Sequence, residues 1–184
     1  MASTITDPIK LLKDSTKKRI SSKKDKDMVT CFEGEDLSRL LKSMEKEIEV
    51  ERCSNKTLPN KLWIKQQFAV GVNEVTRALE RMPPSTQTSN QRFSSCGFQI
   101  RLQAVLVAWD CNPRWLIKHL PALAASRNVP VIYVKDKKQG SIRLGELIKL
   151  KTAIAIGVKA KGNSINQLVE RILCGKYPGK EMSQ

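Results

Sequence analysis

Apolar residues beyond residue 34 follow two spacings that alternate along the chain. Apolar positions every three or four residues predict helices, and short continuous apolar runs predict buried strands. The helical stretches are 35–52, 61–65, 73–82, 111–126, 141–149 and 163–173, and the strand-like runs are 67–70, 102–108, 130–134 and 152–158. Helices that alternate with strands predict an α/β protein, a three-layer α-β-α sandwich with a central mixed sheet of about four strands.

Residues at the ends of these stretches predict where individual helices begin. Asn112 is a candidate N-cap with Pro113 at the first helical position, and Asn163 is a candidate cap for the last helix. The 35–52 stretch is an N-terminal extension whose apolar residues form one helical stripe, so we expect it to pack on the domain or on a partner. The stripe consists of Leu37, Leu40, Leu41, Met44 and Ile48.

Composition divides the chain into segments. The first is basic and polar, and its cluster Lys17 to Lys26 fits a nuclear address, a phosphate contact or a solvated tail. The predicted segments are a flexible tail at 1–34, an amphipathic helix and linker at 35–60, a domain at 61–176 with a loop insertion at 83–98, and a tail at 177–184.

The formal net charge of +15 predicts an anionic partner. Residues 1–60 hold 13 Lys and Arg against 11 Asp and Glu, whereas residues 61–184 hold 20 against 7, so the excess belongs to the predicted domain. No apolar run approaches the roughly 20 residues of a spanning helix, and the N-terminus lacks the apolar core of a secretory signal, so we expect a soluble intracellular protein with no membrane partner.

The cysteine, histidine and lysine patterns of the sequence do not indicate a catalytic site or a metal site. Five scattered cysteines without a Cys-x-x-Cys pair predict free thiols, and we expect no metal site and no cofactor. A single histidine, His119, has no partner that local sequence suggests, so no catalytic residue is assigned. The stretch KDKKQG, residues 135–140, has no nucleotide-cradle spacing, and it predicts a loop that touches phosphate through Lys135 and Lys137 or a solvated turn.

The stretch GVNEVTRALER, residues 71–81, places polar side chains at the start of a predicted helix. Asn73 and Glu74 fall in the first turn, with Arg77 and Arg81 further along, so the four side chains can share one exposed face. Phosphate repels a carboxylate, but the two carboxylate oxygens match the N1–H and N2 amino donors of a guanine whose Watson–Crick edge is free. Ordinary helix capping and surface ion pairing also explain these residues.

The same stretch resembles the sequence signature of the kink-turn RNA-binding superfamily of ribosomal and ribonucleoprotein proteins. The sequence similarity extends over roughly 61–174. It includes AVLVAWDCNP (104–113), the stretch 119–146 and LKTAIAIG (150–157). Three features depart from the family. The 83–97 segment is longer than usual, and Trp109 replaces a commonly charged position, where it is a candidate protein contact. Lys151 and Thr152 stand where many members have an acidic and a branched apolar residue, which favours a more electrostatic and less selective contact there.

The resemblance implies a non-catalytic protein that binds a kink-turn, a structured RNA element with tandem sheared G·A pairs. It implies base contacts from Asn73 and Glu74 and a backbone or base contact from Arg77. Gly71 and Val72 would support them. A loop would contact the unpaired bulge nucleotides, and it contains Leu150, Lys151 and Thr152.

Within the superfamily, the sequence of this chain most resembles the kink-turn-binding subunit of eukaryotic nuclear ribonuclease P and ribonuclease MRP. This similarity implies an accessory subunit among other ribonucleoprotein subunits, in the nucleus and its nucleolus, that supports RNA folding for tRNA 5′ maturation or rRNA processing. Two alternatives stay open: a ribosomal or box C/D or H/ACA small nucleolar ribonucleoprotein component of the same fold, and a protein-interaction adaptor that does not bind RNA.

Overall fold

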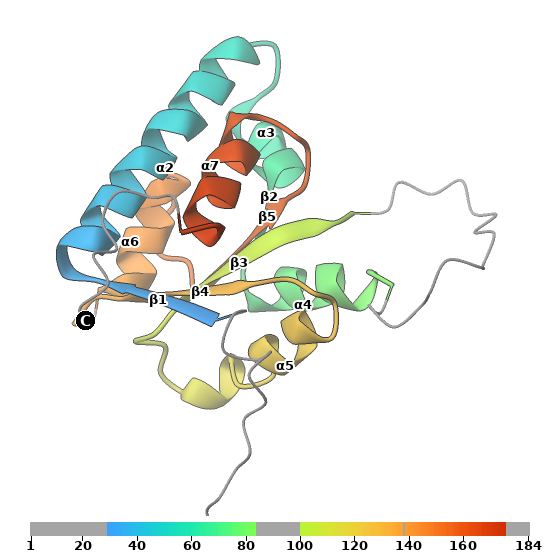
Figure 1. The fold of residues 1–184 in the computed structure, drawn as a ribbon. Helices are drawn as coiled ribbons and strands as arrows, with labels where there is room; N and C mark the ends of the chain where they lie inside the picture. The colour runs from blue at the N-terminus through green and yellow to red at the C-terminus, as the bar shows by residue number, and fades with distance from the viewer. Residues whose placement is uncertain (1–28, 84–99, 138, 176–184) are drawn as a thin grey trace, which may run out of the picture.

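The computed structural model describes residues 29–83, 100–137 and 139–175. Most of the predicted tail at 1–34, most of the loop insertion at 83–98 and the tail at 177–184 lie outside these residues, and the described end of the first tail forms a strand. A five-stranded mixed sheet forms the centre, in the order β1-β4-β3-β5-β2 (Figure 1). The strands are β1 (Val29–Glu33), β2 (Phe68–Val70), β3 (Leu102–Ala108), β4 (Val131–Lys135) and β5 (Ala155–Lys159).

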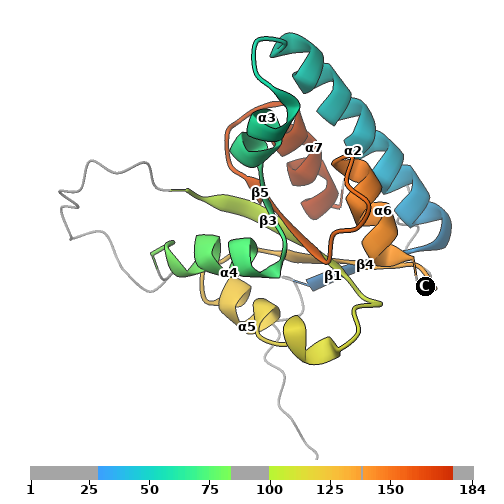
Figure 2. The same ribbon diagram turned by 180° about the vertical axis from the view of Figure 1, so that it is seen from behind.

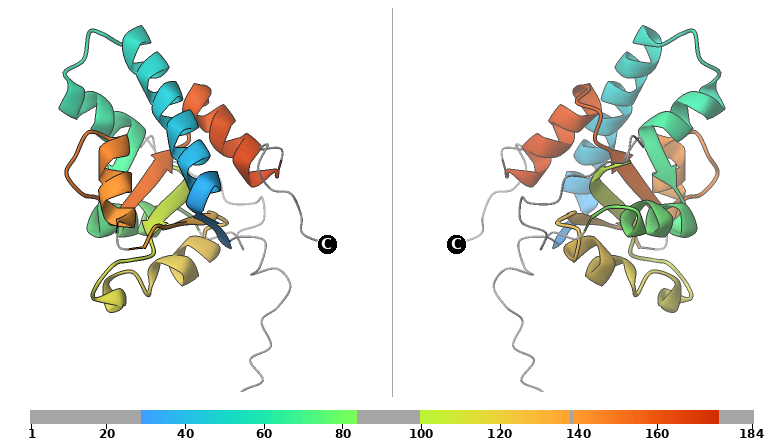
Figure 3. Two further views of the ribbon diagram at one scale, coloured as in Figure 1. Left: turned by 90° about the vertical axis from the view of Figure 1, so that its left-hand side faces the viewer. Right: turned by 90° about the vertical axis from the view of Figure 1, so that its right-hand side faces the viewer.

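Helices cover both faces of this sheet, which confirms the predicted α-β-α sandwich (Figures 1 and 2). One layer contains α2 (Gly34–Ser54), α3 (Asn60–Gln67), α6 (Gly140–Leu147) and α7 (Ser164–Leu173). The opposite layer contains α4 (Val72–Glu80), the short 3-10 helix η1 (Arg114–Leu116) and α5 (Leu120–Ala125). Figure 3 shows the two layers edge-on, with α4 and α5 on the side of the sheet away from α2 and α7.

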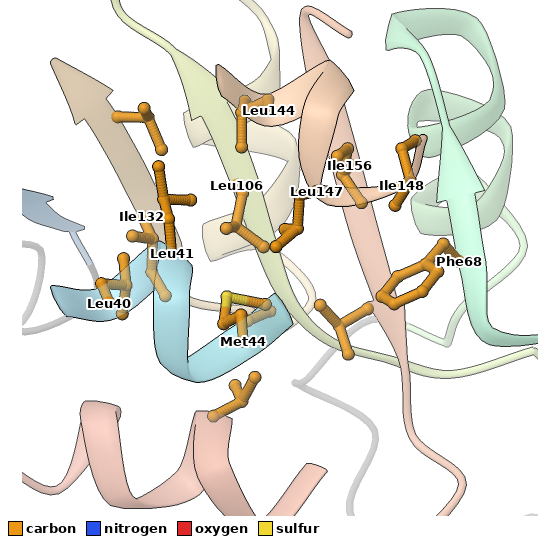
Figure 4. Packing of buried hydrophobic residues seen from close by; sticks show 14 of the residues in the cluster. Leu40, Leu41, Met44, Phe68, Leu106, Ile132, Leu144, Leu147, Ile148 and Ile156 are labelled. Carbon is orange, nitrogen blue, oxygen red and sulfur yellow. The ribbon is translucent and has the colours of Figure 1, made fainter. Parts of the chain in front are cut away.

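The larger core lies under α2, α6 and α7. The apolar stripe of α2 is buried, with Leu40 fully covered and Met44 only 1% exposed, and it packs beside Leu106, Ile132 and Ile156 of the sheet (Figure 4). Full burial of one such side chain stabilises the fold by about 1.5–3 kcal/mol. The extension helix therefore packs on the sheet domain itself, through the stripe that the sequence predicts.

The smaller core joins α4 and α5 to the opposite face of the sheet. Val75 and Leu79 of α4 and Leu120 of α5 are fully buried there, against Val105 and Val107 of β3. Because β3 is covered on both faces, its residues from Ala104 to Ala108 are apolar without alternation. The buried side of α4 leaves its polar residues on the outer face.

The sequence predicts the last helix correctly, including its cap. Asn163 precedes α7 and its side chain accepts a hydrogen bond from the backbone N–H of Asn166 at 3.1 Å. The Asn166 side chain in turn accepts one from the backbone N–H of Asn163 at 3.3 Å. The two side chains form a reciprocal cap that satisfies donors at the start of the helix.

The single helix predicted over 111–126 is wrong. The chain passes through a cis Asn112–Pro113 bond, makes the short η1 turn and begins α5 only at Leu120. Neither Asn112 nor Pro113 caps or opens a long helix. One continuous helix would place Pro121 in its interior, where the ring removes a hydrogen bond, whereas a start at Leu120 places it in the first turn.

Strand β1 is the fifth strand that the apolar pattern does not predict. It pairs in parallel with β4 over Val29 to Glu33 and has no neighbour on its other side. Its residues alternate between exposed and half-exposed, so they carry no continuous apolar run. Within the part of the chain that the structure describes, no helix is long and apolar enough to cross a membrane.

Candidate nucleic-acid interface

The candidate residues gather along one edge of the sheet. Strands β1, β4 and β3 are parallel, and β5 runs antiparallel to β3 and to β2. The carboxyl ends of β1, β4, β3 and β2 therefore lie at the same edge, where β5 begins. The segments after β2, after β4 and before β5 all leave from this edge.

Gly71 sets the start of α4 at that edge. Its φ of +93° lies in a region that side chains other than glycine rarely adopt, and its carbonyl accepts the N–H of Val75 at 3.0 Å. Its own N–H donates to the carbonyl of Ala155 at 2.8 Å, which ties the start of α4 to the first residue of β5. Asn73 and Glu74 follow in the first turn, and both are exposed.

Glu74 is available to a ligand. Among the described residues, no Lys, Arg or His nitrogen lies within 4.0 Å of its carboxylate, so neither Arg77 nor any other cation holds it in an ion pair. The nearby Lys159 donates from Nζ to the carbonyl of Lys65 instead. Burial lowers the pKa of Lys159, and the charge of Glu74 partly opposes that shift.

The remaining α4 candidates lie on its solvent side. Arg77 and Arg81 are exposed, whereas Val75, Ala78 and Leu79 face the core. Thr76 holds the helix from the side, since its hydroxyl donates to the carbonyl of Val72 and shares a 2.8 Å hydrogen bond with Nε2 of His119.

The loop between α6 and β5 is the second part of the interface. Leu150, Lys151 and Thr152 are exposed, and Leu150 exposes 45% of its surface. Gly145 of α6 sets the path of this loop, because a Cβ built there would lie 2.6 Å from the backbone N and Cα of Thr152. The N–H of Leu150 also donates to the Gly145 carbonyl at 2.9 Å.

The structure brings this loop and the start of α4 together. The loop leads into β5, whose first residue is bonded to Gly71, and β5 and β2 are neighbours in the sheet. The sequence pattern indicates no role for Gly145, which lies within the 119–146 stretch of the family resemblance. Lys159 was also missed, because only the fold brings the end of β5 near Glu74.

Lys135 and Lys137 lie elsewhere on the same edge. Lys135 is the last residue of β4 and Lys137 follows it, three strands from β2, which is about 14 Å at the usual spacing between strands. The Nζ of Lys135 lies 2.7 Å from Oε2 of Glu33, and the hydrogen bond and charge of that carboxylate raise the pKa of Lys135. Both lysines line a cavity that no residue of 71–74 or 150–152 lines.

Residues that commonly ligate metals are scattered over the described parts of the chain. Within 29–83, 100–137 and 139–175, no three His, Cys, Asp or Glu side chains lie together in a way that could hold a metal ion. Cys31, Cys53, Cys111 and Cys174 are free thiols, and Cys96 lies outside the described residues. Burial, and secondarily the charge of Asp110, raise the pKa of the Cys111 thiol.

The fold and the site together define a class of protein. It is an α-β-α sandwich that presents an exposed Asn-Glu pair at a helix start preceded by glycine. Residues 99–168 match the ribosomal protein L7Ae/L30e/S12e/Gadd45 family. Over these residues the chain is similar to the L7Ae/L30e family.

Individual relatives agree with this placement. The chain is 31% identical over 106 residues to large ribosomal subunit protein eL8 of Caenorhabditis elegans, and the match covers 55% of this chain. It is 33% identical over 110 residues to ribonuclease P protein subunit p38 of Mus musculus, with 60% of this chain covered. Each match spans only 32% of the relative's own length.

A solved structure supports the fold alone. The Giardia lamblia 15.5kD RNA binding protein superposes with a TM-score of 0.51 at 17% sequence identity, over 78% of this chain and 90% of that one.

Proposed function

We propose that this chain is a non-catalytic RNA-binding protein that holds a kink-turn against the edge of its sheet. Asn73 and Glu74 contact the bases of the tandem sheared G·A pairs. One observation carries the proposal: an exposed carboxylate without an ion-pair partner among the described residues, at a helix start that Gly71 and Ala155 fix in place.

The chemistry of the pair favours a base edge over the RNA backbone. A carboxylate accepts hydrogen bonds and cannot donate, so Glu74 is repelled by phosphate and matches two adjacent donors. A guanine in a sheared pair keeps the N1–H and an N2 hydrogen available. Asn73 can both donate and accept, which suits the mixed edges of a neighbouring base.

Neighbouring side chains supply the contacts that RNA binding needs besides base recognition. Arg77, Arg81 and Lys151 are exposed cations beside the pair and can neutralise phosphates on either side of it. Leu150 offers an exposed apolar side chain on which a splayed bulge base can pack, and Thr152 adds a hydroxyl for hydrogen bonding.

The particle we propose is the ribonuclease P or MRP ribonucleoprotein, with the protein acting in the nucleus and nucleolus. The similarity to ribonuclease P protein subunit p38 supports it. In such a particle the chain helps the RNA fold for tRNA 5′ maturation or rRNA processing and leaves cleavage to other components. The similarity to protein eL8 favours a ribosomal role as the second candidate.

Binding of a short kink-turn RNA to matched variants tests the molecular part. Glu74→Gln keeps the shape of the side chain and removes the charge, and we expect it to weaken binding by about 1–3 kcal/mol. Glu80→Gln is the control, since Glu80 is an exposed carboxylate on the same helix outside the candidate pair. Both variants are compared on RNA with two G·A pairs and on RNA with Watson–Crick pairs in their place.

A loss on the G·A RNA alone, and from Glu74→Gln alone, supports base recognition. Equal losses on both RNAs would show that Glu74 acts without reading the pairs. Absence of binding to either RNA would favour the adaptor function. Recovery of the protein from cells, followed by sequencing of the bound RNA, then distinguishes the ribonuclease P or MRP RNA from ribosomal RNA.

A further inference from the structure

A second hollow opens at the same edge of the sheet, away from Glu74. It has a volume of about 860 Å³, within the range of ligand sites in proteins. Its lining comes from the segments that follow β1, β3 and β4. We call it the Trp109 cavity, and its lining residues include Glu33, Trp109, Asp110, Arg114, Lys135, Asp136 and Lys137.

The topology of the sheet makes this a favoured place for a ligand. The chain leaves β3 toward η1 and α5 on one face, and it leaves β4 toward α6 on the other face. Neighbouring parallel strands whose connections diverge in this way leave a crevice at their carboxyl ends. The Trp109 cavity lies at that point of divergence, between the end of β3 and the end of β4.

Other groups already engage each carboxylate of the cavity. Glu33 is paired with Lys135 at 2.7 Å, and Asp136 is paired with Arg143 outside the lining at 2.9 Å. Oδ1 of Asp110 accepts the N–H of Ser141 at 3.2 Å. Among the described residues of the lining, two cations, Lys137 and Arg114, and one carboxylate, Asp110, have no ion pair, so the cavity keeps an excess of one positive charge.

Flat side chains form its wall beside these cations. Trp109 exposes 38% of its surface, and the guanidinium of Arg114 lies over its ring at 4.8 Å from the centroid. The ring of Tyr133 meets Trp109 at right angles, with 5.2 Å between centroids. Indole and guanidinium planes are the surfaces on which unpaired bases stack in proteins.

We propose that the Trp109 cavity binds one unpaired nucleotide of the same RNA, with the base stacked on the Trp109–Arg114 pair and the phosphate held by Lys137. The proposal rests on the proposed function, because the kink-turn places the RNA at this edge. By strand spacing, the ends of β3 and β4 that border the cavity lie about 10 Å and about 14 Å from the end of β2, so a short unpaired extension of the bound RNA can reach it.

The observations favour RNA over a protein partner at this site. An apolar protein anchor would desolvate Lys137 and Arg114 without compensating their charge, whereas a phosphate pairs with Lys137 and a stacked base leaves the edge of the Arg114 guanidinium free to donate. Aromatic and basic groups in one hollow are the combination that single-stranded nucleic acid uses.

Tryptophan fluorescence isolates the base contact. The chain has three tryptophans, and Trp63 is only 2% exposed, whereas Trp115 is 70% exposed and outside the cavity lining. In Trp115→Phe, Trp109 is therefore the one tryptophan that a base can reach. We expect a kink-turn RNA with five unpaired adenosines at one end to quench its emission more than the blunt kink-turn RNA.

Affinity measurements with matched variants test the same contact. We expect the extension to raise affinity on the order of tenfold, and Arg114→Gln and Lys137→Gln to remove most of that gain. Lys118→Gln is the control, because Lys118 is an exposed cation just after η1 that does not line the cavity. All variants bind the blunt RNA in parallel.

The outcomes separate the two proposals. A gain that Arg114→Gln and Lys137→Gln remove and Lys118→Gln keeps supports the cavity site. Equal quenching and equal affinity for blunt and extended RNA, with Glu74→Gln still selective for G·A pairs, would overturn the cavity site and leave the kink-turn site standing. If the extension raises affinity by the same factor in Arg114→Gln, Lys137→Gln and Lys118→Gln, the cavity site is also overturned.

Discussion

Gly145→Ala tests how the fold positions the bulge-binding loop. The added Cβ would lie 2.6 Å from the backbone N and Cα of Thr152 and 2.9 Å from the Leu150 carbonyl oxygen. Backbone atoms cannot rotate away as the end of a side chain can. An ordinary contact needs at least 3.4 Å, so the loop must move by roughly 1 Å relative to α6.

Two opposing effects set the cost to stability. Overpacking of this kind costs about 1–3 kcal/mol, and replacement of a helical glycine by alanine returns about 1 kcal/mol. We therefore expect Gly145→Ala to lower the free energy of unfolding by about 0–2 kcal/mol. RNA binding depends on the loop position itself, so we expect at least a tenfold loss of affinity, or about 1.4 kcal/mol.

Chemical unfolding and RNA titration of the same samples check this prediction. Ile142→Ala is the control, since Ile142 is an exposed, uncharged position of α6. The expected result is a larger effect on binding than on stability for Gly145→Ala, and small effects on both for the control. A stable Gly145→Ala protein that binds the kink-turn RNA as tightly as the original chain would refute a positioning role for this glycine.

Three further changes probe other parts of the structure. Asn166→Ala removes a buried amide that bonds several backbone and side-chain groups, so urea unfolding should show a loss of about 2–3 kcal/mol, and no loss would contradict that network. Lys137→Gln should lower the slope of log affinity against log salt by about 1, and Lys135→Gln by less because Glu33 already pairs with it; equal slopes in both variants would contradict this ranking. Because burial raises the pKa of Cys111 above the ordinary thiol value of 9.0, the neutral thiol adds stability below pH 9.0, and this stability is lost as pH rises through the folded-state pKa. The original chain should therefore lose more unfolding free energy than Cys111→Ala between about pH 8 and about pH 10. Thermal unfolding of both proteins at several pH values measures the difference.

Continuous apolar runs and side-chain caps are the features that the sequence predicts best. Strand β3 begins and ends at the predicted residues 102 and 108, because both of its faces are buried and Gln103 is the one polar residue in it. Asn163 is a confirmed cap, because its partner Asn166 lies at a fixed local spacing. Such features depend on neighbours in sequence.

Features that depend on distant neighbours are the ones that the sequence does not show. Strand β1 is held by backbone pairing with β4 and buries little of its own surface. The order of strands decides that Lys135 lies about 14 Å from Gly71, and nothing local encodes that order. The same order places β5, which follows the loop at 150–152, beside β2 and the start of α4.

The interaction of Glu74 with one guanine is the central claim, and a double-mutant cycle measures it directly. Glu74→Gln is combined with inosine in place of the guanosine of a G·A pair, which removes the N2 amino group. Direct contact predicts that the two losses in binding free energy fall short of additivity by about 1 kcal/mol or more. Losses that add to within about 0.5 kcal/mol would contradict the contact between this carboxylate and that base.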